Sequence, residues 1–136
     1  MVRIEVTAEE EVFIRERIER FSVEGPENLQ WQLPHIRLHG ALPLYVGWTE
    51  SAGIQPDGTL VRWSTEHEWA GARELDDRTW VNLALVQGAD RYPPLRRLIP
   101  SRPKSARTCT ACNGAGRFPQ KPDIICECGG VGWIAV

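Results

Sequence analysis

Four cysteines near the C-terminal end of the chain constrain its fold more than any other feature. They are the only cysteines among 136 residues. Two closely spaced pairs on tight turns can supply the four ligands of a tetrahedral zinc site, at about 2.3 Å from the metal. Four thiolates fill the coordination shell and leave no open position for water or substrate. The pattern therefore predicts one structural zinc ion, bound by Cys109, Cys112, Cys126 and Cys128.

A glycine pattern follows each pair. The sequence reads Cys-x-Gly-x-Gly from Cys112 and again from Cys128. Glycine accepts backbone angles that a side chain forbids, so the chain can curl back and point its N–H groups at the sulfur atoms. The repeat predicts two similar turns that share one metal ion. Its glycines are Gly114, Gly116, Gly130 and Gly132.

Residues 109–133 resemble the cysteine-rich zinc finger of DnaJ-type chaperones, whose repeated element is Cys-x-x-Cys-x-Gly-x-Gly. In that family two such repeats hold one zinc ion, and the module forms hairpins that help to contact polypeptide clients. The first repeat matches this element in full. In the second, the first cysteine of the element would stand at Ile125, but the cysteine is at Cys126, so a tighter turn is expected. The chain has two repeats where the chaperones have four, and no J-domain signature precedes them. The resemblance implies the metal site and not chaperone activity.

The cysteines leave alternatives open at this level. A redox pair of thioredoxin type, two disulfides or unliganded thiols would use the same residues. Residues 1–6 alternate charged and apolar side chains where a signal peptide needs an unbroken apolar stretch, and no run of eighteen apolar residues occurs. We therefore expect a cytoplasmic protein that does not enter a membrane, in a reducing compartment that favours metal over disulfides.

An N-terminal helix is the clearest local element. Thr7 and Glu10 have capping-box spacing, and apolar residues follow at helical intervals up to Phe21. The helix is predicted over residues 8–21.

Most of the remaining apolar segments read as extended. The turn sequence Gln55-Pro56-Asp57-Gly58 between two of them is typical of a tight hairpin. The sequence therefore predicts an α+β fold with an antiparallel sheet, an N-terminal helix and a C-terminal zinc-bound hairpin module. The expected strands span residues 2–6, 29–33, 44–48, 60–63 and 79–86, with a loop at 50–53, a surface connection at 65–78 and a short helical turn at 92–98.

Charge divides unevenly along the chain. The net charge is −2, but residues 1–90 carry −8 and residues 91–136 carry +6. Either the two parts attract each other or the basic part contacts nucleic acid. The predicted organisation is an α+β domain at 1–99, a basic, proline-containing linker at 100–108 and a zinc-binding module at 109–136. The candidate phosphate contacts are Arg96, Arg97, Arg102, Lys104 and Arg107.

Six tryptophans are many for this length. Most occupy strand-like positions and are expected in the core, with one or two exposed as anchors for a partner.

Residues 42–45 and 53–61 resemble the strand and hairpin region of SUKH-type immunity proteins, small bacterial α+β domains that bind and neutralise partner toxins. That resemblance implies an acidic, aromatic-rich face for a protein partner.

Histidines and carboxylates are weaker candidates for metal ligands and for acid or base groups. His35 and His39 lie between Pro34 and Gly40, which favours extended or turning chain over a helix. His67 could act as an acid or base, but nothing in the sequence positions a nucleophile beside it. The carboxylates Glu74, Asp76 and Asp77 are typical of a solvated loop.

The predicted function is a non-enzymatic, zinc-containing protein-binding factor, concretely a bacterial immunity or adaptor protein. The alternatives are a nucleic-acid-associated zinc protein that uses the basic segment 91–107, and a small hydrolase that uses His67 or the carboxylate cluster.

Overall fold

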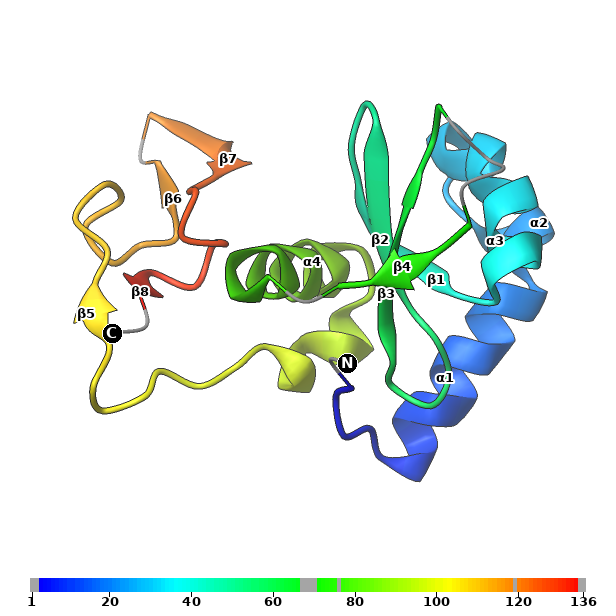
Figure 1. The fold of residues 1–136 in the computed structure, drawn as a ribbon, viewed down its shortest axis with the longest axis horizontal. Coiled ribbons are helices and arrows are strands. Elements are labelled where there is room, and N and C mark those ends of the chain that lie inside the picture. The colour runs from blue at the N-terminus through cyan, green and yellow to red at the C-terminus, as the bar shows by residue number, and fades with distance from the viewer. Residues whose placement is uncertain (1–2, 67–70, 76, 119, 135–136) are drawn as a thin grey trace. The chain divides into compact units, whose positions relative to one another are not determined.

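The computed structural model describes residues 3–66, 71–75, 77–118 and 120–134, and the chain divides into two compact units, residues 1–75 and 76–136 (Figure 1). The first unit combines helices with an antiparallel sheet of strand order β1-β2-β3-β4. In Figure 1, α1, α2 and α3 lie to one side of this sheet. Its elements are α1 (Ala8–Glu19), α2 (Phe21–Glu24), η1 (Glu27–Gln32), α3 (Leu33–His39), β1 (Leu42–Val46), β2 (Glu50–Ile54), β3 (Leu60–Ser64) and β4 (Arg73–Glu74).

The second unit consists of helices followed by two small antiparallel ladders, β5 with β8 and β6 with β7. The α+β class, the N-terminal helix and the C-terminal hairpins are confirmed. The sequence grouped residues 1–99 together, whereas the compact units divide after Leu75, which puts α4 in the same unit as the cysteines. Its elements are α4 (Arg78–Arg91), η3 (Pro93–Leu98), β5 (Arg107–Thr108), β6 (Arg117–Phe118), β7 (Lys121–Ile125) and β8 (Trp133–Ile134).

Helix α1 begins with the predicted capping box. The Thr7 hydroxyl accepts a hydrogen bond from the Glu10 N–H at 3.1 Å, and the Glu10 carboxylate accepts one from the Thr7 N–H at 2.8 Å. Both bonds satisfy backbone donors that have no partner inside the helix. The helix ends at Glu19, and the short α2 continues from Phe21, whose side chain is buried.

The sheet contains a strand that the sequence presented as a loop. Residues 50–54 form β2, the strand between β1 and β3, and the predicted turn at 55–58 joins β2 to β3. Ser51 and Ala52 have small side chains and are fully buried, so pairing on both edges outweighs their low strand propensity. The strand predicted at residues 2–6 is wrong: in the described part of it, only Arg3 makes a bridge, to Thr59.

Two further segments predicted as strands are helical. Residues 29–33 belong to η1 and α3, where Pro34 occupies the first turn and does not bend an extended chain. His35 and His39 consequently lie on one helix, contrary to the prediction. Proline is tolerated in a first turn because the N–H it lacks would have no helical partner there.

Residues 79–86, predicted as a buried strand, lie within helix α4. Its buried residues include Val81, Leu85 and Ala89, each separated by four positions, as on one face of a helix. The Asp77 carboxylate accepts a hydrogen bond from the Trp80 N–H at 3.1 Å and caps the helix. Apolar residues of this segment lie on more than one face of the helix, so their spacing in the sequence does not show a helical period. The helical turn predicted at 92–98 is confirmed as η3.

Candidate metal centre

The four cysteine side chains converge in the second unit. All four are free thiols, and their sulfur atoms lie within 4.8 Å of one another. The separation is 3.7 Å between Cys109 and Cys126 and 3.9 Å between Cys112 and Cys128. A tetrahedral zinc ion with bonds of about 2.3 Å places its sulfur ligands about 3.8 Å apart. The four residues, called the cysteine cluster below, therefore fit a tetrahedral metal ion of zinc's size.

Burial of the cluster suits a closed site. Each cysteine is at most 8% exposed, and Phe118 packs against the group. All four ligand positions come from protein thiols, so a metal ion held here would have no open coordination position. The arrangement can support local structure and offers no site for metal catalysis.

The two halves of the site have matching supports. The first turn, residues 109–116, lies between β5 and β6, and the second turn, residues 126–132, lies between β7 and β8. Each ladder joins the two turns: Thr108 pairs with Trp133, and Ile125 pairs with Arg117. The two pairs occupy equivalent positions before and after each turn. The module thus consists of two repeats, and the strand before each turn pairs with the strand after the other turn.

Backbone hydrogen bonds also connect each repeat to the other. The Cys109 N–H donates to the Gly132 carbonyl oxygen, and the Cys126 N–H donates to the Gly116 carbonyl oxygen, both at 2.9 Å. In each case the first cysteine of one repeat binds the last glycine of the other. These two backbone hydrogen bonds hold both cysteine pairs in place relative to each other without the help of a metal ion.

Glycine is required where the two turns touch, because a Cβ atom would overlap the other turn and because the φ angles are positive. Gly116 and Gly132 have φ values of +79° and +82°. A Cβ atom on Gly116 would overlap the Gly130 carbonyl oxygen, and one on Gly132 would overlap the Gly114 carbonyl oxygen. The Cys-x-Gly-x-Gly repeat therefore encodes the packing of each turn on the other, a role beyond the chain reversal predicted from the sequence.

Helix α4 supports the second turn, a contact that was not predicted from the sequence. A Cβ atom on Gly129 would lie 2.8 Å from the Asn82 Cβ, and one on Gly130 would lie 3.0 Å from the Val86 Cγ1. The Asp90 carboxylate also forms an ion pair with Arg117 of β6. The cysteine module is therefore packed on α4 by close backbone approach and by charge. The sequence could have suggested this only through the extra glycine at 129.

The environment of the sulfur atoms differs across the cluster. Burial raises the pKa of the Cys112 thiol, but the Gly116 N–H, at 3.2 Å from its sulfur, and the three other thiols favour the thiolate more strongly and lower the pKa to about 7. Burial is the main reason that the pKa of Cys126 is raised to about 12 and that of Cys128 is raised. Among these three thiols, Cys112 therefore ionises most readily, and binding a divalent cation would release the protons that remain on the thiols it binds.

The other candidate residues are not part of the cysteine cluster. The basic residues of the segment, Arg96, Arg97, Arg102, Lys104 and Arg107, are all exposed. In the part of the chain that the structure describes, no second group of three or more metal-ligating side chains occurs. His35 and His39 stack with ring centroids 6.1 Å apart beside Trp63, which gives them a packing role.

The residues considered for hydrolysis do not form a described site. Asp77 serves as the cap of α4, and Glu74 is exposed on β4. His67 and Asp76 lie outside the described residues, as does Trp69.

Comparison of the chain with protein-family models, with curated proteins and with solved structures finds no match. None of the described helices is long and apolar enough to cross a membrane.

Proposed function

We propose that the cysteine cluster holds one structural zinc ion and that the protein is a non-enzymatic binding factor for another protein, with a bacterial immunity or adaptor role as the concrete form. The observation that carries the zinc assignment is the sulfur separation of 3.7 to 3.9 Å in two buried pairs. Zinc accepts four thiolates in this geometry and has no redox chemistry of its own. The resemblance to the DnaJ-type zinc finger supports the same ion.

Elemental analysis tests the ion. Protein purified without added metal is expected to contain one zinc per chain, and Cys112→Ser is expected to lose it. Thr110→Ser, an exposed change inside the first turn, is the matched control and should retain the metal. A zinc-free wild-type chain with oxidised cysteines would contradict the proposal.

Protein binding is supported by an exposed indole on a fixed turn. Trp48 lies between β1 and β2 and is 99% exposed. Its carbonyl oxygen accepts a hydrogen bond from the Thr65 hydroxyl at 2.9 Å, and the Gly47 N–H donates to the Glu50 carbonyl oxygen at 2.9 Å. An exposed tryptophan on a hydrogen-bonded turn is a typical anchor at protein interfaces, because its side chain buries a large area on binding. Its side chain therefore does not contribute to the core of the first unit, as far as the described residues show.

The charge of the first unit indicates the kind of partner. Residues 1–75 contain 7 Lys and Arg against 13 Asp and Glu, a net charge of −6. A basic protein surface would be attracted to this unit. Affinity capture from the native host, followed by titration of the captured protein, is expected to show binding that weakens with salt and falls at least tenfold in Trp48→Ala. Val23→Ala, which changes a residue that is 81% exposed on α2, should leave the affinity unchanged.

A second candidate, nucleic-acid binding, is favoured by the exposed basic segment. The second unit carries 9 Lys and Arg against 5 Asp and Glu, a net charge of +4. Phosphate contacts by Arg102, Lys104 and Arg107 would produce a steep loss of affinity with rising salt. The absence of binding to duplex or single-stranded DNA and RNA at low salt would remove this candidate.

A further inference from the structure

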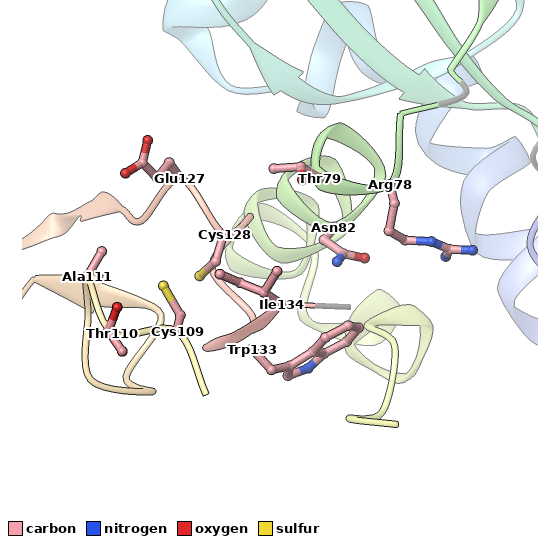
Figure 2. Close-up of a pocket in the computed structure, with 10 residues that line it drawn as sticks. All are labelled: Arg78, Thr79, Asn82, Cys109, Thr110, Ala111, Glu127, Cys128, Trp133 and Ile134. Atoms are coloured by element: carbon pink, nitrogen blue, oxygen red, sulfur yellow. The ribbon is translucent and has the colours of Figure 1, made fainter. Parts of the chain in front are cut away.

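A pocket of about 540 Å³ lies beside the cysteine cluster, within the second unit (Figure 2). The first half of α4, both cysteine turns and β8 form its walls. Its volume is in the range that holds a small ligand or a few residues of a peptide. The residues that matter for its chemistry are Arg78, Asn82, Glu127, Trp133 and Ile134.

Asn82 gives the pocket an unused polar group. Its side chain is 3% exposed, and its Oδ1 atom has no hydrogen-bond partner in the described part of the chain. A buried acceptor without a partner destabilises the fold, and an apolar residue would be favoured at this position on the buried face of α4. A peptide N–H is a common chemical group that satisfies such an acceptor.

The ends of the pocket carry opposite charges. Figure 2 shows Glu127 and Arg78 at opposite ends, with Asn82 between them. Arg78 is exposed in the first turn of α4, and no ion pair is recorded for it among the described residues. A guanidinium group binds a carboxylate through two parallel hydrogen bonds, and the positive end of the helix dipole adds to the attraction. The wall formed by Trp133 and Ile134 suits an apolar side chain.

We propose that this pocket binds the C-terminal end of a polypeptide. Arg78 takes the free carboxylate, Asn82 pairs with a peptide group, and Trp133 and Ile134 contact an apolar side chain. Glu127 favours a basic residue upstream in the peptide. The inference rests on the proposed protein-binding function and names the part of a partner that the second unit would recognise.

Two degenerate pentapeptide pools test the proposal, one with free C-terminal carboxylates and one with C-terminal amides. Zinc-loaded full-length protein is incubated with each pool, and retained peptides are measured by mass spectrometry. We expect the carboxylate pool to be enriched at least tenfold over the amide pool, with apolar residues selected near the C-terminus. Equal retention of the two pools, or no retention of either, would overturn the proposal.

Variants assign the effect to the pocket. Arg78→Gln is expected to abolish the preference for the carboxylate, whereas Arg96→Gln, an exposed change of equal charge on η3, should keep it. Asn82→Leu is expected to lose peptide binding and to raise the melting temperature, because it removes the unpaired amide oxygen. A preference that survives Arg78→Gln and Asn82→Leu would place the peptide elsewhere and refute the proposed site.

The same samples separate this inference from the proposed function. Zinc content reports on the cysteine cluster, and retention of the partner that depends on Trp48 reports on the first unit. A chain that keeps both properties but shows no carboxylate preference would refute the pocket alone.

Discussion

At the scale of single residues, the cysteine module depends on glycines as much as on ligands. Gly116 and Gly132 allow the two turns to touch through their backbones, and the Gly116 N–H also donates to the Cys112 sulfur. These contacts position the sulfur atoms at distances that suit one ion. Metal retention should therefore be sensitive to residues that do not touch the metal.

Gly116→Ala tests that dependence. The new Cβ would overlap the Gly130 carbonyl oxygen, and the backbone angle φ at this position is left-handed. We therefore expect the free energy of unfolding to fall by more than about 3 kcal/mol and the rate of zinc release to increase greatly. Urea unfolding and chelator-driven release measure these effects.

Gly40→Ala is the matched control for backbone angle. Gly40 has a φ of +61°, but a Cβ atom there would meet nothing within 4 Å. Only the angular cost, about 1 to 2 kcal/mol, is expected, with zinc release unchanged. Equal effects of the two variants would show that contact between the turns is unimportant.

His39 provides a pH-dependent prediction. Burial and the neighbouring charge of His35 lower the pKa of His39. On acidification through the ordinary pKa of about 6.5, the unfolded chain takes up a proton before the folded chain does, so the stability of the protein should fall. The decrease in urea midpoint between pH 7.5 and 5.5 should be smaller in His39→Gln than in the wild type. An unchanged decrease would show that His39 titrates alike in both states.

At the scale of elements, α4 is the support on which the cysteine module is built. Gly129, Gly130 and the Asp90–Arg117 ion pair place the second turn and β6 against it. The ladders of the module are short, since β5, β6 and β8 have two residues each. Strands of this length have little stability by themselves, so the module depends on its packing against α4, and a metal ion held by the cysteines would add to its stability.

The N-terminal cap of α4 can be changed without touching the cysteines. Asp77→Ala removes the acceptor of the Trp80 N–H and is expected to cost about 1 kcal/mol. Asp77→Asn keeps an acceptor and should recover most of that loss. Chemical denaturation of both variants, with zinc content as a check, measures the effect. Equal stability of Asp77→Ala and the wild type would show that the cap contributes nothing.

At the scale of the whole molecule, the two units differ in charge and in what stabilises them. The first unit, net −6, has a core that includes Phe21, Ile36 and Trp63, while the cysteine module of the second unit, net +4, is organised around the cluster. Removal of metal should consequently affect the units unequally.

Hydrogen exchange after chelation tests this difference. With zinc removed under reducing conditions, amide protection in residues 107–134 is expected to collapse, because metal binding supplies much of the folding free energy of such modules. Protection in β1, β2 and β3 should persist. Simultaneous loss of protection in both units would show that the first unit also depends on the metal.

The sequence by itself determined the features that are local. Cysteine spacing identified the cluster, the capping box located α1 and the Asp-Gly sequence located the turn before β3, because each depends on neighbours within a few positions. Only the tertiary structure decided the features that depend on distant partners. Residues 50–53 are a strand because β1 and β3 flank them, and residues 79–86 are a helix that packs on the glycines of the second cysteine turn. The pocket beside that turn joins residues about fifty positions apart, and such proximity follows from packing and not from local pattern.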